Sequence, residues 1–317
     1  MSLKAEAATE KGGTAERHRK MRGYGAPLLF LLPASILILL FFIIPVITTV
    51  VLSLTDISTL TFRNPSWAGL ENYRRLFNDP FIPKILGNTA RYLVLTLLFN
   101  VTMGLVLAIL TSLIPERWGD NFRALWLVPR IMPPVVYVFV WQGLLARAPF
   151  GLISDLSGIN KGWITAAPWT TIILANGFVG ASFGMLLFTS AIRAIPRDLF
   201  YASAVDGAST WQTVRRVVLP LLRWPILFVT VYQTLSLLTS FEYILLLTNG
   251  GPGLFKTTVW SLHAYKIALS NYFGNVEFAL GAAMATFLVF IGVALSLIYM
   301  RVFNFNELVS EPKIEVN

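Results

Sequence analysis

The chain has 317 residues, of which 56% are hydrophobic and only 13% are charged, and its formal net charge is +9. This composition is typical of a polytopic membrane protein rather than of a soluble domain. The absence of cysteine excludes disulfides and thiol chemistry, and with two histidines, His18 and His263, we expect no His/Cys metal site. No basic stripe carries interleaved aromatic residues on a soluble domain, so we attribute the charge to membrane topology and expect no nucleic-acid binding.

Six apolar stretches are long enough to cross a bilayer, which takes about 20 residues. They are roughly 26–54, 89–114, 124–146, 169–194, 225–248 and 276–302. The first begins too far into the chain, and runs too long, for a cleaved signal peptide, so we expect it to stay as an anchor. The sequence therefore predicts an all-α membrane protein with six transmembrane helices.

Lys and Arg residues set the predicted orientation. With the N-terminus in the cytoplasm, basic residues are more frequent in the inner segments than in the outer ones, which favours cytoplasmic location of both termini. We expect a cytoplasmic tail over 1–25, a transmembrane domain over 26–303 that includes a cytoplasmic loop at 195–224, and a second tail over 304–317. The predicted loops between spans are 56–88, 147–168 and 249–275 outside, and a short 115–123 inside.

The third span carries a charge, Arg130, beside three prolines at positions 129, 133 and 134. Prolines break a helix, and broken helices that line a cavity are where transporters hold substrate. Because a charge inside the bilayer is costly and marks a pathway or a pair, we predict that Arg130 donates to substrate hydroxyls or to a charged group. The alternative is snorkelling to the inner headgroups, since Arg130 lies about 10 Å into the span at 1.5 Å per residue.

Polar residues in the fourth and fifth spans extend this predicted pathway. Asn176 lies one turn before Gly180, where an amide can read hydroxyl groups and the glycine leaves room for a ring. Glu242 points away from the fifth-span stripe, and we expect it to pair with a basic group or to lie near the outer interface. The stripe itself, for which hydrogen bonding between helices is the alternative, falls on one helical face and consists of Gln233, Ser236 and Ser240.

The segment between the fourth and fifth spans has the pattern of two short helices joined at a glycine. Asp198 is a candidate N-cap for the first helix, and Gly207 can take the left-handed conformation that ends it. Ser209 and Gln212 form a predicted capping box that starts the second helix, and Pro220 limits its continuation. Such a rigid knob is what a membrane protein needs when a cytoplasmic protein must push on it.

This segment resembles the EAA loop of permease subunits in ATP-binding-cassette (ABC) importers of the carbohydrate-uptake branch. The family pattern is Pro-x-Asp-Leu-Tyr-Glu-Ala-Ala-x-x-Asp-Gly-Ala, followed about nine residues later by Leu-Pro. Tyr201 stands where the family has Glu, and Ser203 where it has the second Ala. Trp67-Ala-Gly-Leu-Glu-Asn-Tyr73 and Thr248-Asn-Gly-Gly-Pro252 also resemble segments of this branch. The matching positions are Pro196, Asp198, Leu199, Ala202, Asp206, Gly207, Ala208, Leu219 and Pro220.

The resemblance implies a type I importer fold in a prokaryotic plasma membrane, with no cofactor in this chain. It also implies four kinds of partner: membrane lipid, a second and different permease subunit, two ATP-binding-cassette ATPase subunits that hold ATP-Mg, and an external solute-binding protein. The residues that it implies for coupling to the ATPase are Asp198, Leu199, Tyr201, Ala202, Ser203, Asp206, Gly207, Ala208, Trp211 and Arg215. The positions that match substrate-lining ones in maltose-type permeases are Arg130, Pro134, Asn176, Gly180, Gln233, Leu237 and Ser240, of which only Asn176 and Gly180 look the same in kind.

Two motifs suggest enzymes, and we favour another role for each. Gly180-Ala-Ser182-Phe-Gly184 matches a hydrolase elbow, which needs a strand-to-helix turn, but it lies inside an apolar span, where small residues four apart serve helix packing. The segment 250–257 resembles a Walker A loop that lacks its second glycine. We therefore predict a non-enzymatic permease for a sugar, oligosaccharide or polyol derivative, working by alternating access. The alternatives are an ion- or proton-coupled secondary transporter and an intramembrane hydrolase that uses Ser182.

Overall fold

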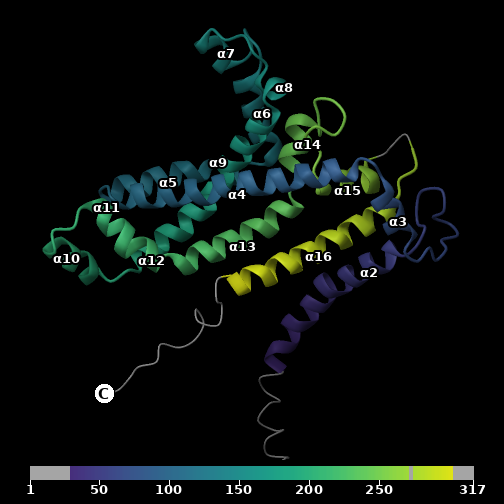
Figure 1. Ribbon diagram of the computed structural model, residues 1–317, viewed down its shortest axis with the longest axis horizontal. Helices are drawn as coiled ribbons and strands as arrows, with labels where there is room; N and C mark the ends of the chain where they lie inside the picture. The colour runs from purple at the N-terminus through teal and green to yellow at the C-terminus, as the bar shows by residue number, and fades with distance from the viewer. Residues whose placement is uncertain (1–28, 271–273, 303–317) are drawn as a thin grey trace, which may run out of the picture.

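The computed structural model describes residues 29–270 and 274–302, and this part of the chain consists of helices with one isolated antiparallel bridge between Thr55 and Trp67 (Figure 1). In chain order the helices are the π-helical turn η1 (Leu39–Ile43), α2 (Ile44–Ser53), α3 (Glu71–Asn78), α4 (Ile82–Ser112), α5 (Glu116–Ile131), α6 (Pro134–Leu145), α7 (Leu152–Ser157), α8 (Trp163–Ala166), α9 (Pro168–Arg193), α10 (Arg197–Val205), α11 (Thr210–Thr213), the π-helical turn η2 (Val214–Val218), α12 (Leu219–Leu221), α13 (Arg223–Thr239), α14 (Glu242–Thr248), α15 (Trp260–Leu269) and α16 (Phe278–Val302).

Four helices are each long and apolar enough to cross a membrane: Leu29–Ser53, which contains η1 and α2, and α4, α9 and α16. Two further pairs pass the same test only when taken together. The pair α5 and α6 bends by 103°, and the pair α13 and α14 bends by 50°. The described residues therefore hold four to six spans, and the predicted number of six is reached when each bent pair is one span.

Helices α4 and α9 pack along each other through the middle of the bundle, because glycine removes side chains where they meet. A Cβ on Gly104 would lie 2.8 Å from the backbone oxygen of Ala181 and 3.1 Å from Cα of Gly184. Ser182, in the middle of the motif, is fully buried and donates to the Val179 carbonyl of its own helix over 2.6 Å. The predicted packing role of the 180–184 motif is thus confirmed, and Ser182 is not an exposed nucleophile.

The predicted boundaries are wrong where helices continue through charged residues. α4 begins at Ile82 rather than at 89, and α5 begins at Glu116, so the expected inner loop 115–123 is mostly helix. The segments 56–88, 147–168 and 249–275, which were expected to be outer loops, likewise contain α3, α7 with α8, and α15. Apolar runs mark only the part of a helix that fits a bilayer, whereas the hydrogen-bonded ladder extends as far as caps and prolines allow.

The bundle has two ends with different elements (Figure 1). The short helices α10 and α11 lie at one end, and α3 lies at the other, next to α15. α6, α7 and α8 project from one side, as the sharp bend after α5 requires, and α2 runs along α16 on the opposite side. The predicted tails 1–25 and 304–317 lie outside the described residues.

Candidate functional site

A cavity of about 350 Å³, here called the polar cavity, lies where α4, α5, α9, α13 and α14 approach one another. Every residue that the sequence singled out for a substrate pathway lines it: Arg130, Asn176, Gly180, Gln233, Ser236, Ser240 and Glu242. Leu237, one of the maltose-type positions, lines it too, whereas Pro134 begins α6 and is not among the lining residues. Aromatic side chains complete the wall, namely Phe183, Tyr232, Phe241 and Tyr243. The structure thus gathers these residues into one place, and their contact with a ligand stays a prediction.

Both charges of the polar cavity lie at breaks in the spans. Arg130 is in the last turn of α5, just before the extended Met132, and its guanidinium lies 5.4 Å from the centre of the Phe183 ring. Glu242 is in the first turn of α14, after Ser240 takes an extended conformation with ψ 129°. A cation at a helix C-terminus and an anion at a helix N-terminus are each stabilised by the helix dipole. Neither side chain forms an ion pair with another described residue.

The prediction that Glu242 points away from the stripe is wrong. It assumed a continuous helix with 3.6 residues per turn, in which a residue two positions after Ser240 faces another side. Because α13 ends at Thr239 and the chain bends before α14, Glu242 faces the same cavity as Ser240. The predicted break in the third span is confirmed between Ile131 and Pro134.

Asn176 and Ser240 are connected through a residue that the sequence did not single out, Tyr92 of α4. Asn176 Nδ2 donates to Tyr92 Oη over 2.9 Å, and Tyr92 Oη lies 3.4 Å from Ser240 Oγ, to which it donates. The Tyr92 side chain is almost fully buried. Three helical segments are therefore joined at this wall of the cavity, and the orientation of the Asn176 amide is set by a bond to α4.

A second connection joins α4, α9 and α13 through Gln233. Asn100 Nδ2 donates to Gln233 Oε1 over 2.6 Å, and Gln233 Nε2 donates to the Gly180 carbonyl over 3.0 Å. For Gln233, the alternative of hydrogen bonding between helices therefore holds. The prediction that Gly180 leaves room for a ring is wrong, because a Cβ there would clash with the amide of Asn100. That space is filled by protein.

A pattern in the second span would have revealed Tyr92 and Asn100. Polar and small residues recur every four positions along α4 and form one buried face, which consists of Asn88, Tyr92, Thr96, Asn100, Gly104 and Ala108. A spacing of four keeps side chains on one helix face. We missed this signal because the polar residues were judged singly against a strongly apolar background.

The predicted pair of short helices, here called the helical knob, spans α10 to α12. Gly207 adopts the left-handed conformation with φ 69°, and Ser209 and Gln212 form both bonds of the capping box, as predicted. The predicted N-cap is wrong, because Pro196 takes the cap position and Asp198 lies inside the first turn without a capping bond. Proline fixes a φ that suits the start of a helix. An aspartate in the first turn still stabilises the helix, because its negative charge interacts favourably with the helix dipole.

The second helix of the knob continues through η2 and ends at Leu221, one residue after Pro220. The residues predicted for coupling divide into two groups. Ser203 and Ala208 are half-buried and line a cavity of about 330 Å³ behind the knob, where the Ser203 hydroxyl lies 3.2 Å from that of Thr213. The others are exposed at the surface, with Tyr201 62% and Trp211 68% accessible: Asp198, Leu199, Tyr201, Ala202, Asp206, Gly207, Trp211 and Arg215.

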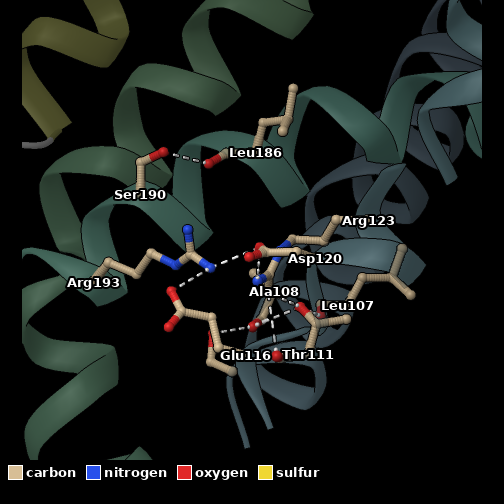
Figure 2. A network of polar contacts seen from close by, with 10 residues as sticks. Leu107, Ala108, Thr111, Glu116, Asp120, Arg123, Leu186, Ser190 and Arg193 are labelled. Atoms are coloured by element: carbon tan, nitrogen blue, oxygen red, sulfur yellow. Dashed lines mark hydrogen bonds and ion pairs between the residues drawn. The ribbon is translucent and has the colours of Figure 1, made fainter. Parts of the chain in front are cut away.

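An ion cluster at the base of the knob joins α5 to α9 (Figure 2). Arg193 Nη2 lies 2.7 Å from Asp120 Oδ1 and 3.3 Å from Glu116 Oε1. Arg123, with a side chain only 7% exposed, donates to Asp120 over 2.6 Å and to the hydroxyl of Thr111 at the end of α4 over 2.8 Å. This cluster was not predicted, because 115–123 was expected to be a loop. The spacing of Glu116, Asp120 and Arg123 along one helical face was the available signal.

The segment that follows α14 is held by its own hydrogen bonds. Asn249 and Gly250 take left-handed conformations with φ 49° and 81°, so Thr248–Pro252 ends the fifth span as predicted. The Thr257 hydroxyl donates to the Gly251 carbonyl over 2.7 Å, and that of Thr258 donates to the Gly250 carbonyl over 3.2 Å. In this Walker-like segment the threonine hydroxyls therefore serve the loop itself.

Comparisons with known proteins identify the family. A family model described as "binding-protein-dependent transport system inner membrane component" matches residues 100–307. A probable ABC transporter permease protein of Pyrococcus horikoshii is 32% identical over 282 residues, which is 86% of this chain and 94% of the relative. The maltose/maltodextrin transport system permease protein MalF of Klebsiella aerogenes is 31% identical over 250 residues, but this covers 74% of this chain and only 48% of MalF.

Among solved structures, the fold is shared with a chain of a bacterial ABC transporter involved in the import of the acidic polysaccharide alginate. The TM-score is 0.76 at 22% sequence identity, and the alignment covers 93% of this chain and 100% of that one. The resemblance drawn from the EAA-like segment is thereby confirmed, and the secondary-transporter and hydrolase alternatives are replaced. The chain belongs to the binding-protein-dependent inner membrane components, the multi-pass permease subunits of ABC importers, which have no cofactor and leave ATP hydrolysis to partner subunits.

Proposed function

We propose that this permease translocates a sugar, oligosaccharide or polyol derivative by alternating access through the polar cavity. The observation that carries the proposal is that side chains able to hydrogen-bond hydroxyl groups meet aromatic rings in one cavity at two broken spans. Ligand sites combine apolar and aromatic walls with a few placed polar groups, and unwound helices are where transporters hold substrate. The likeness to MalF and to a chain of the alginate importer supports a carbohydrate.

The proposed orientation places both termini and the helical knob in the cytoplasm, with tails over 1–25 and 304–317 and the transmembrane domain over 26–303. The excess of basic residues in the inner segments supports it. The Thr248–Pro252 loop and α3 then lie outside, where a solute-binding protein delivers the ligand. A second permease, expected to be a different chain, completes the cavity.

The helical knob is the proposed contact with one of the two ATPase subunits that bind ATP-Mg. Its exposed outer face and its short, capped helices suit a part that must move as a unit. Closure of the ATPase pair displaces the knob, and the ion cluster passes this displacement to α5. Arg193 is the last residue of α9, next to the knob, and it binds Asp120 near the start of α5. At its other end, α5 carries Arg130 into the polar cavity.

Uptake by the complete complex tests the proposal. The permease pair, its ATPase subunits and its solute-binding protein are reconstituted in liposomes, and entry of labelled maltose, trehalose and cellobiose is measured with and without ATP. We expect ATP-dependent entry of at least one of them. In Asn176→Leu, the concentration for half-maximal uptake should rise about fivefold, the value of one neutral hydrogen bond.

The matched control is Ser190→Ala, which removes a polar group from α9 outside the cavity, where the hydroxyl donates to the Leu186 carbonyl of its own helix. Its uptake should equal that of the wild type. Equal losses in both variants, or entry of none of the three disaccharides, would contradict the proposal.

A further inference from the structure

We infer that Asn100 of α4 is a specificity-determining residue of the polar cavity, which accepts a hydrogen bond from a hydroxyl group of the translocated ligand. The inference rests on the proposed function and adds a residue to it. Asn100 lines the cavity, and the residue is only 1% exposed. Its apolar neighbours on α4, such as Phe99 and Val101, gave no reason in the sequence to assign it to a ligand.

The orientation of the Asn100 amide is fixed from the far end of its hydrogen-bond chain. A backbone carbonyl only accepts, so the Gly180 oxygen requires Gln233 to present its Nε2, at 3.0 Å. The Oε1 of Gln233 is then the acceptor that faces Asn100, and Asn100 must present its Nδ2, at 2.6 Å. Reversing either amide would bring two donors or two acceptors together. The atom that remains is Asn100 Oδ1.

Asn100 Oδ1 is buried and has no hydrogen-bond partner among the described residues. A buried carbonyl oxygen without a donor destabilises a protein, and such groups in native structures have a reason. The amide cannot turn away, because Gly180 lies directly against it and Gln233 holds its other atom. The structure therefore holds an unpaired acceptor on a residue that lines the polar cavity, and no described residue supplies its donor.

The donor that fits is a hydroxyl group. The neighbouring residues Ser236 and Ser240 can both donate and accept, and Glu242 accepts, so a ligand that carries several hydroxyls satisfies all of them together. A ligand that offers only acceptors at this wall would leave Asn100 Oδ1 unpaired. A permanently bound water is the competing occupant, since it also donates.

Deoxy analogues distinguish the two occupants in the complete, reconstituted complex. Uptake of maltose, trehalose and cellobiose, and of their monodeoxy analogues, is compared between the wild type and Asn100→Leu, which removes the acceptor at similar size. The preference of the solute-binding protein is the same for both permeases. It therefore cancels when the uptake of an analogue relative to its parent sugar is compared between them. In the wild type, we expect removal of one particular hydroxyl to reduce uptake about fivefold relative to the parent sugar. In Asn100→Leu, removal of that hydroxyl should not change uptake, while removal of the other hydroxyls should have the same effects as in the wild type.

Two further variants keep the test decisive. Asn100→Asp removes the donor to Gln233 Oε1 but retains an acceptor for the ligand, so the same hydroxyl should still affect uptake in this variant even if Asn100→Leu does not assemble. Thr102→Val is the control on the same helix, because the Thr102 hydroxyl is exposed and bonds to its own helix, and it should behave as the wild type does. Equal weakening of every analogue in both Asn100 variants would overturn the inference in favour of a structural water, whereas failure of the wild type to import any disaccharide would overturn the proposed function as well.

Discussion

The helical knob and the polar cavity are held in place by different kinds of interaction. The knob is shaped by neighbours in the chain: a proline, a left-handed glycine and a capping box within 17 residues of sequence, from Pro196 to Gln212. The cavity is held by side-chain bonds between helices, such as the bond from Asn100 to Gln233, which are 133 positions apart. A part held locally can move as a rigid body, whereas a part held across helices changes whenever those helices separate.

This difference suits the two proposed tasks. A contact surface for an ATPase must keep its shape while it moves, and caps and turns do not depend on the rest of the bundle. A ligand cavity must open and close, and bonds such as those of Asn176 and Gln233 can be exchanged for bonds to a ligand when the helices shift. The ion cluster between the two regions belongs to neither type, because it combines a local pair, Asp120 with Arg123, with a long-range one to Arg193.

The strongest test of the local design is Gly207→Val, for which we expect the largest effect. The left-handed conformation at φ 69° costs about 1–2 kcal/mol for a residue with a Cβ, and more for a β-branched one. Because a Cβ at this position would meet no atom within 4 Å, the effect comes from the backbone alone. Ligand-stimulated ATP hydrolysis by the complete complex should fall about tenfold or more, while the amount of folded permease stays measurable.

Gly143→Val is the matched control for this variant. Gly143 also has open space around its Cα, but its φ is in the ordinary helical range, so the same side chain causes no strain there. Normal ligand-stimulated ATP hydrolysis in Gly207→Val, or an equal loss in Gly143→Val, would show that coupling to the ATPase subunits does not depend on the shape of the knob.

Next in size is Asp120→Asn, which breaks the ion cluster. It leaves the guanidinium of the buried Arg123 without the carboxylate of the half-exposed Asp120, and a buried charge that loses its partner destabilises a protein. Glu116→Gln is the comparison, since the Glu116 side chain is 77% exposed and an exposed pair contributes about 0–1 kcal/mol. We expect the thermal unfolding midpoint to fall clearly in Asp120→Asn and hardly at all in Glu116→Gln.

A double-mutant cycle of Asp120→Asn with Arg193→Gln separates coupling from stability. If the bond to Arg193 passes the displacement of the knob to α5, ligand-stimulated ATP hydrolysis should fall in either single variant, and the double variant should be no worse than Asp120→Asn alone. Independent, additive losses would indicate that the 2.7 Å contact has only a local role.

Tyr92→Phe tests the cavity side of the comparison and should have a smaller effect. It removes one hydroxyl from the buried bond network, so that Asn176 loses its acceptor and Ser240 its donor. The expected loss of ligand-binding free energy is about 1 kcal/mol, which corresponds to a roughly fivefold rise in the maltose concentration for half-maximal uptake. Tyr73→Phe, which removes a hydroxyl bonded to Ser53 near α3, is the control, and an equal shift there would mean that Tyr92 has no particular role in the cavity.

The same contrast explains what sequence reasoning found. The capping box and the left-handed Gly207 were predicted correctly because their partners are close in sequence: Ser209 and Gln212 are three residues apart, and the Gly207 N–H donates to the Ala204 carbonyl. The lining of the cavity was predicted from prolines and polar residues within apolar spans, where each residue is unusual in itself. Tyr92 and Asn100 were missed because their importance depends on which residues of α9 and α13 face them, and only tertiary packing determines that.

Errors in the prediction also have physical causes. Gly180 was interpreted as empty space, but a glycine inside a helical bundle just as often admits a neighbouring helix, and here it admits Asn100. Glu242 was misplaced because no proline marks the break at Ser240. Asp198 was predicted as the N-cap because aspartate favours that position, yet the adjacent Pro196 starts the helix two residues earlier.

The segment from Asn249 to Leu269 tests whether local and long-range support can be separated within one region, and here we expect the smallest effect. Its turn is local, but Asn88 of α4 donates to the carbonyls of Phe255 and Thr258, which makes the loop depend on the bundle as well. His263 is buried beneath this loop with its ring edge-on to Phe255. Burial lowers the pKa of His263 below its ordinary value of 6.5, with a smaller opposing effect from Asp79 and a minor lowering by Lys266.

Because the folded-state pKa is the lower one, the unfolded chain binds the proton more readily. Stability from this residue is therefore complete above about pH 6.5 and decreases as the pH falls through the folded-state pKa. The thermal unfolding midpoint should drop between pH 7.5 and pH 5.5, and His263→Phe should reduce that drop while leaving the knob unaffected. If His263→Phe and the wild type lose the same stability on acidification, protonation of the buried imidazole is not what destabilises this loop. Asn88→Leu, which removes only the bonds from α4, then becomes the variant that measures the long-range support.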